Sequence, residues 1–181
     1  MFAAVILAIA VTDIAVSLNR LLEAGARVRW DWLAPMAALV AFLKIVTQWW
    51  TWFFARPLAG GLTFEMYVGV LVGAVLLFLL AAASLPSEAD GPVIDLAAYY
   101  QRVRRRYWWL FAAHWLVSNA VDIWIQMQVS GARLDLLSPA YLVLPVAVSL
   151  ALLRWRWWHA LCLATFTALY LAQFFGKGLG Q

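Results

Sequence analysis

The sequence predicts an all-α integral membrane protein, a bundle of six transmembrane helices forming a single membrane domain over residues 1–181. Of its residues, 66% are hydrophobic and 12% are charged, whereas a soluble domain has about 45–50% apolar and about 25% charged residues. The apolar residues also fall into runs close to the roughly 20 residues that a helix needs to cross a bilayer. Short polar segments separate these runs, so we expect no soluble domain.

The first half of the chain contains three predicted spans, at about 2–22, 33–54 and 64–85. Pro35 suits the first turn of the second span, because the N–H that proline lacks would have no partner there. A turn rich in proline and glycine, with Pro57, Gly60 and Gly61, separates the second span from the third. The third span is nearly pure aliphatic after Tyr67.

The second half contains three more predicted spans, at about 107–128, 139–153 and 159–175. Before the first of these, the segment 95–106 places Leu96, Tyr99, Tyr100 and Val103 at helical spacing, with arginines between them. This pattern predicts a short amphipathic helix that lies in the membrane interface and leads into the fourth span.

The distribution of basic residues among the loops predicts the orientation. Most of them lie at the end opposite the termini: Arg20, Arg27, Arg29, Arg102, Arg104, Arg105, Arg106, Arg154 and Arg156. The other end holds Arg56, Arg133 and Lys177. By the positive-inside rule, both termini then lie outside a bacterial-type inner membrane. The bilayer, and not a nucleic acid, is the partner that this positive charge indicates.

Two similar segments suggest an internal repeat. Residues 25–27 and 131–133 both read Gly-Ala-Arg, and each is followed by an aspartate and then by Pro35 or Pro139. Each segment lies between the first and second helix of a three-helix half. The sequence therefore predicts two halves of inverted topology, as is common in transporters. The alternative is that residues favourable in helix turns have converged.

A polar stripe crosses the fourth span. His114, Ser118, Asp122 and Gln126 are spaced four residues apart, which puts them on one face of a helix. Such a stripe is expected to face protein, water or a ligand and not lipid. It predicts a path for protons or a small solute, for which histidine is a suitable relay. The alternative is a hydrogen-bonded seam between helices.

Two opposite charges lie near the middle of the first two spans, Asp13 and Lys44. An isolated charge at the bilayer centre costs at least about 2.5–3.5 kcal/mol, so we expect these residues to pair. The pair is either an ion or proton site that opens when the bridge breaks, or a static bridge that fixes the helix packing.

The arginine cluster Arg102, Arg104, Arg105 and Arg106 is a candidate site for anionic lipid or for the acidic surface of a partner. Its alternative role is that of a topology anchor.

The sequence offers little for cofactors or catalysis. His114 and His159 are the only histidines, and both are predicted near the inner face, where a haem with two axial histidines is conceivable. No metal is expected, because one cysteine, Cys162, and two isolated histidines lack ligand spacing. No phosphate loop or hydrolase motif occurs, so we expect no enzyme.

Two segments resemble a group of small polytopic bacterial membrane proteins of unknown function. They are residues 12–22, with Asp13, Ser17 and Arg20, and residues 95–100 followed by the arginines. The resemblance implies no activity. From the residues themselves, we expect a transporter or channel-like protein for a small solute or ion, coupled to protons through the intramembrane charges. The alternative is a non-catalytic subunit or scaffold of a larger membrane complex. Besides the bilayer, the partners we expect are further copies of the chain or the other members of such a complex.

Overall fold

The computed structural model describes residues 2–55, 64–87, 93–130 and 139–176, and this part of the chain is mostly helical, as the sequence predicts. Its helices and strands are α1 (Phe2–Ala24), η1 (Gly25–Arg27), β1 (Val28–Arg29), α2 (Leu33–Ala55), α3 (Phe64–Ala82), β2 (Ile94–Asp95), α4 (Leu96–Ser130), η2 (Pro139–Leu142), α5 (Val143–Leu152) and α6 (Arg156–Gly176).

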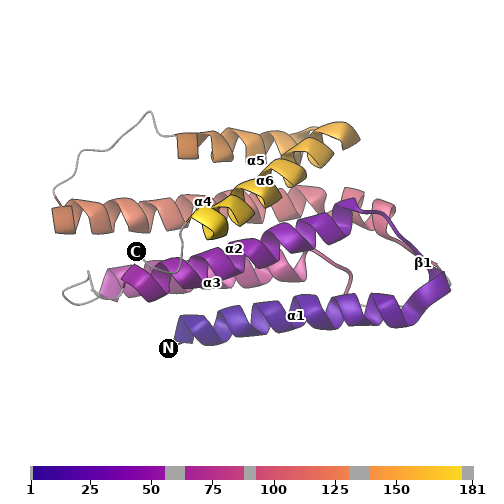
Figure 1. Cartoon of the computed structure of the whole chain (residues 1–181), viewed down its shortest axis with the longest axis horizontal. Coiled ribbons are helices and arrows are strands. Elements are labelled where there is room, and N and C mark those ends of the chain that lie inside the picture. The colour runs from indigo at the N-terminus through magenta and orange to yellow at the C-terminus, as the bar shows by residue number, and fades with distance from the viewer. Residues whose placement is uncertain (1, 56–63, 88–92, 131–138, 177–181) are drawn as a thin grey trace.

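The six α-helices lie lengthwise in one bundle, and consecutive helices run in opposite directions (Figure 1). Consequently α1 begins, and α6 ends, toward the same end of the bundle. Helix α3 lies between α1 and α4, α5 packs on the other side of α4, and α6 crosses α2 obliquely. The helix α4 therefore touches most of the others.

The packing within the two halves differs. In an inverted repeat, the helices α1 to α3 would correspond to α4 to α6 in order. In the first half, α1 packs chiefly on α3, whereas α4 packs chiefly on α5 in the second. The arrangement therefore gives no support to the predicted duplication, although the directions of the helices alternate as it requires.

Three helical segments are long and apolar enough to cross a membrane: Phe2–Arg27, Leu33–Trp52 and Phe64–Ala82. By contrast, α5 has 10 residues, and a helix of that size is about 15 Å long, against about 30 Å for the hydrocarbon core. The structure thus establishes three candidate spans within its described part, and the full set of six stays a prediction.

The helix α4 corrects one detail of the prediction. It has 35 residues without a break, so that the segment 95–106 does not form a separate helix but supplies the first turns of α4. Two features explain this continuity. The Asp95 carboxylate accepts the Ala98 N–H at 2.9 Å and so caps the start of the helix. No glycine or proline follows until after Ser130.

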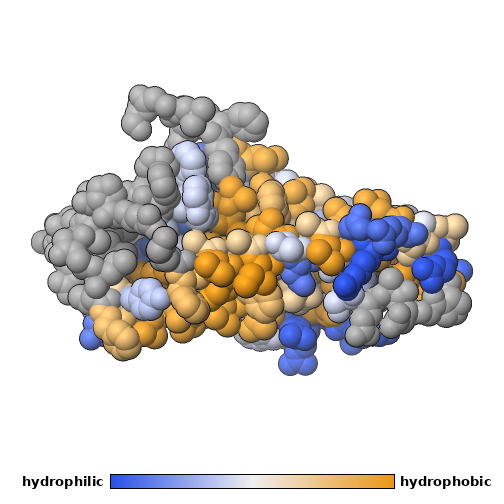
Figure 2. All heavy atoms as spheres, turned by 90° about the horizontal axis from the view of Figure 1, so that it is seen from below, coloured by the Kyte–Doolittle hydropathy of each residue, from blue (hydrophilic) through white to orange (hydrophobic). Residues whose placement is uncertain are grey.

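The surface of the bundle supports a location in a membrane. Helix α1 is strongly apolar over its first half, yet only 28% of its most apolar stretch is buried, and Phe2, Val5 and Ile9 are exposed. A helix with this pattern needs an apolar surrounding. Figure 2 shows a broad apolar region over the middle of the molecule, with hydrophilic residues gathered toward the end where α1 ends.

A short parallel strand pair joins two connections at this hydrophilic end. Val28 of β1 pairs with Ile94 of β2, and Arg29 pairs with Asp95. The pairing ties the segment after α1 to the segment before α4. Sequence reasoning missed it, because two residues are too few to show the alternation that identifies a strand.

Asp31 connects the start of α2 to the start of α6. Its Oδ1 accepts the backbone N–H of Leu33 at 3.0 Å, and its Oδ2 pairs with the guanidinium of Arg156. Asp31 is buried, whereas the Arg156 side chain is 55% exposed. The residue therefore acts both as a helix cap and as half of a partly hydrated ion pair.

Two substitutions separate these roles. Asp31→Asn keeps the capping oxygen and removes the charge, so we expect it to lower the free energy of unfolding by up to about 1 kcal/mol. Asp31→Ala also removes the cap and is expected to cost about 1 kcal/mol more. Denaturant titration in micelles, followed by circular dichroism, measures both values. Equal losses in the two variants would rule out the capping role, and Arg156→Gln should abolish the effect of Asp31→Asn.

Candidate functional site

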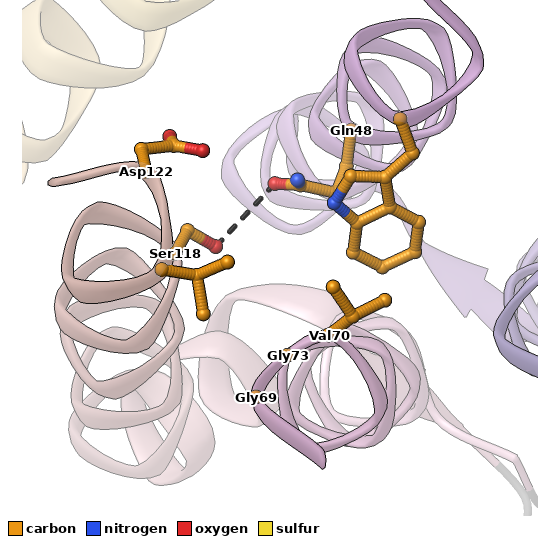
Figure 3. Close-up of a pocket in the computed structure, with 8 residues that line it drawn as sticks. Gln48, Gly69, Val70, Gly73, Ser118 and Asp122 are labelled. Carbon is orange, nitrogen blue, oxygen red and sulfur yellow. Dashed lines mark hydrogen bonds between the residues drawn. The ribbon is translucent and has the colours of Figure 1, made fainter. Parts of the chain in front are cut away.

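Three residues of the polar stripe on α4, His114, Ser118 and Asp122, lie along the contact with α2 and α3 (Figure 3). His114 is fully buried, Ser118 is half-buried and Asp122 is exposed. Opposite them, α2 contributes Gln48, which is buried, and Lys44 one turn earlier. We call these five residues the polar seam.

A chain of hydrogen bonds connects three helices across the seam. The Nδ1 of His114 lies 3.1 Å from the carbonyl oxygen of Gly73 on α3, and its Nε2 lies 3.2 Å from Ser118 Oγ. Ser118 Oγ in turn lies 3.4 Å from Gln48 Oε1 on α2. Because a carbonyl only accepts, Nδ1 of His114 carries a hydrogen.

This chain admits two proton arrangements. A serine hydroxyl has one hydrogen to donate, so Ser118 donates either to His114 or to Gln48. In the first case His114 is neutral, and Gln48 turns its NH₂ group toward Ser118. In the second case His114 is charged and donates to Ser118, which donates to the carbonyl of Gln48. A half-turn of one amide thus accompanies the gain of a proton.

Lys44 is the cation of the seam. Its charge interacts with the carboxylate of Asp122 and with His114. The ammonium attracts Asp122 and opposes a second positive charge on His114. Lys44, on the facing helix, therefore interacts electrostatically with two residues of the stripe, His114 and Asp122.

The predicted pair between Asp13 and Lys44 does not form. The described residues contain no ion pair between them, and the carboxylate that acts on Lys44 is that of Asp122. Asp13 lies partly exposed on α1, where its charge acts on Tyr99. The reason is the packing: α1 lies chiefly against α3 and not against α2.

A narrow cavity opens beside the seam. It is lined by Gln48, Trp52, Gly69, Val70, Gly73, Ser118, Val121 and Asp122. The space open to the centre of a water molecule is about 10 Å³, which corresponds to about one water. In this arrangement the cavity has room for about one water molecule and not for a larger solute.

Two glycines of α3 permit this close packing, and sequence reasoning missed both. Gly69 and Gly73 are four residues apart and face α4, the small-residue spacing that lets membrane helices approach. A Cβ at Gly69 would lie 2.6 Å from Val121 Cγ2, whereas one at Gly73 would meet His114 at 3.9 Å. The signal was present in the sequence, as two glycines within an otherwise aliphatic span.

The other histidine belongs to a second polar cluster, at the hydrophilic end of the bundle. His159 Nε2 lies 3.0 Å from the carbonyl oxygen of Leu153, so this nitrogen carries the hydrogen. Its Nδ1 then accepts from the Tyr100 hydroxyl at 2.8 Å, and Trp108 Nε1 donates to Tyr100 at 3.2 Å. Every polar atom of this short chain has a partner, which indicates a structural role.

The histidine geometry gives no support to the haem hypothesis. All four ring nitrogens of His114 and His159 hydrogen bond within the protein, and the two rings belong to separate clusters. For metals, the described residues include no group of three or more His, Cys, Asp or Glu side chains that could hold an ion. Cys162 is buried and unpaired with another cysteine.

The remaining candidates differ from one another. Gln126 lies on α4, and its side chain is outside the described part of the structure. Among the arginines, Arg102, Arg105 and Arg106 are exposed, whereas Arg104 is buried. These four arginines look equivalent in the sequence, but the fold buries Arg104 and leaves the other three exposed.

Comparison with known proteins provides no relative. No protein-family model, curated protein or solved structure matches this chain. The function must therefore be inferred from the chemistry of the site itself: a cation, a carboxylate, an imidazole, a hydroxyl and an amide at the meeting of three apolar helices.

The two glycines provide a matched test of the packing at the seam. Val121 is β-branched and stiff within a helix, so it cannot rotate away from a methyl group at position 69. We expect Gly69→Ala to lower the free energy of unfolding by about 1–3 kcal/mol. Gly73→Ala, with room for its methyl group, should stay within about 0.5 kcal/mol of the wild type. Thermal unfolding in micelles distinguishes the two variants. Equal losses of stability in both would contradict the close approach of α3 to Val121 at Gly69.

Proposed function

We propose that the protein is a small membrane transporter that moves a small solute or ion together with a proton. The observation that carries the proposal is that Gln48, Ser118 and Asp122 line one narrow cavity. Lys44 interacts electrostatically with Asp122, and His114 is hydrogen-bonded to Ser118. The proposed arrangement is six spans in a bacterial-type inner membrane with both termini outside. The distribution of Lys and Arg among the loops supports it.

The energetic cost of the seam supports a functional role. Apolar helices do not need charged residues in order to pack against one another. Each isolated charge at the bilayer centre costs at least about 2.5–3.5 kcal/mol. The attraction between the charges of Lys44 and Asp122 reduces this cost, but two apolar residues would avoid it altogether. Ionisable residues at such depth commonly mark paths for ions or protons.

The geometry also suggests how a proton would act. Attraction between Lys44 and Asp122 holds α2 against α4, and Asp122 is the exposed member of the pair. A proton that neutralises Asp122 removes this attraction, which allows the cavity to widen. Inside, the reorientation of the Gln48 amide would let His114 take up the proton. The seam is thus a two-state element of the kind that alternating access requires.

A second candidate function is that of a non-catalytic subunit in a larger membrane complex. The observation in its favour is that His114 and Ser118 already have partners within the chain, as in a packing seam between helices. In that case the exposed apolar surface would bind the helices of a partner as well as lipid.

Proton flux into liposomes tests the transporter proposal. We expect the purified protein to dissipate an imposed pH gradient, read with an entrapped pH-sensitive dye while valinomycin and potassium clamp the potential. Asp122→Asn and Lys44→Gln should lose most of this flux, because each removes one partner of the switch. Asp13→Asn is the matched control, since Asp13 lies outside the seam, and it should retain the flux.

Two outcomes would overturn the proposal. One is a flux no greater than that of empty liposomes under every gradient tested, together with a stoichiometric partner in mild detergent, which would favour the subunit. The other is wild-type flux in both seam variants, once their unfolding temperatures show that they are folded.

A further inference from the structure

Arg104 differs from the arginines around it. It lies in the first third of α4 and is 6% exposed. Arginine is among the residues that are almost never fully buried unless paired. The described structure, however, contains no salt bridge from Arg104 to a carboxylate.

One end of the Arg104 guanidinium caps α5. Its Nη1 donates to the carbonyl oxygens of Leu150, Ala151 and Leu153 at 3.3, 3.0 and 2.7 Å. The last carbonyls of a helix lack partners within the helix and carry partial negative charge. Arg104 thereby holds the corner between α5 and α6 against α4, and this accounts for one nitrogen of the three.

The other edge of the guanidinium is not accounted for. The Nε of Arg104 is buried and has no hydrogen-bond partner in the described part of the protein. An unsatisfied buried donor costs about 1–3 kcal/mol, and more when it is charged. The N–H of Nε and one N–H of Nη2 point the same way, and together they form the fork with which arginine binds a phosphate or carboxylate.

The charged groups that act on Arg104 are chiefly positive. Burial lowers the pKa of Arg104, and the charge of Arg154 lowers it further. Arg105 acts in the same direction, and no carboxylate of the described residues is among the groups that act on Arg104. Three like charges repel unless an anion lies between them. The cluster therefore has the composition of an anion site.

The same corner presents apolar side chains. Leu152, Leu153 and Trp155 are exposed on either side of Arg154, where α5 ends and α6 begins. Aliphatic side chains next to a basic cluster suit an acyl chain, and tryptophan is enriched at the level of lipid headgroups. These neighbours favour a lipid over a free anion.

We propose that the unpaired edge of Arg104, together with Arg105 and Arg154, binds the phosphate of an anionic phospholipid at the corner formed by α4, α5 and α6. This inference rests on the location in a membrane and not on transport, so that each can fail without the other.

Native mass spectrometry of the full chain, titrated with phosphatidylglycerol in detergent, tests the site. Arg104→Lys keeps the positive charge and the donors that cap α5 but removes the fork. We expect it to weaken binding of the first phosphatidylglycerol by about tenfold, the effect of losing one charge-assisted hydrogen bond. Arg102→Lys is the matched control on an exposed residue of the same helix, and it should bind as the wild type does.

A second pair of variants covers the case in which Arg104→Lys fails to fold. Arg105→Gln and Arg154→Gln leave the cap of α5 intact, and each should weaken binding severalfold. Equal binding of phosphatidylcholine and phosphatidylglycerol, or wild-type affinity in Arg104→Lys, would overturn the proposal. So would inorganic phosphate that binds as tightly as the lipid and displaces it, because the ligand would then be a soluble anion.

Discussion

Polar groups inside this bundle must find their partners within the protein or at its ends, because the surrounding surface is apolar. Helix α1 is largely exposed yet carries phenylalanine, valine and isoleucine on its outer face, and hydrocarbon offers no hydrogen bonds. Polar side chains are therefore clustered, and two of the places where they meet involve α4. One is the seam of Lys44 and the His114 chain, and the other is the corner that Arg104 holds.

Helix α4 connects these two places and most of the fold. Arg104, near its start, caps α5, and Tyr107 donates its hydroxyl to the carbonyl oxygen of Ala37 on α2 at 2.7 Å. Three turns from Arg104, His114 binds the backbone of α3 through Gly73. One continuous helix thus connects the corner at Arg104 with the seam at His114.

Much of this arrangement could be predicted from the sequence, because it depends on local patterns. The apolar runs locate the helices, and the four-residue spacing places His114, Ser118 and Asp122 on one face. The partners across helices could not be predicted, since they depend on which helices touch. Asp13 and Lys44 were expected to pair because they lie on consecutive helices. However, α1 lies chiefly on α3, and the carboxylate whose charge acts on Lys44 is that of Asp122. The burial of Arg104 among exposed arginines could not be predicted either, because it depends on how α5 packs against α4.

The seam depends on the electrostatic interaction between Lys44 and Asp122, and a double-mutant cycle measures the coupling free energy of these two residues. Lys44→Met, Asp122→Leu and the double variant would be unfolded in bicelles, beside a parallel cycle that pairs Lys44→Met with Asp13→Leu. We expect a coupling free energy above about 0.5 kcal/mol between Lys44 and Asp122, the limit for independent sites, and none between Lys44 and Asp13. Additive losses at Lys44 and Asp122, with coupling to Asp13 instead, would contradict the seam described above.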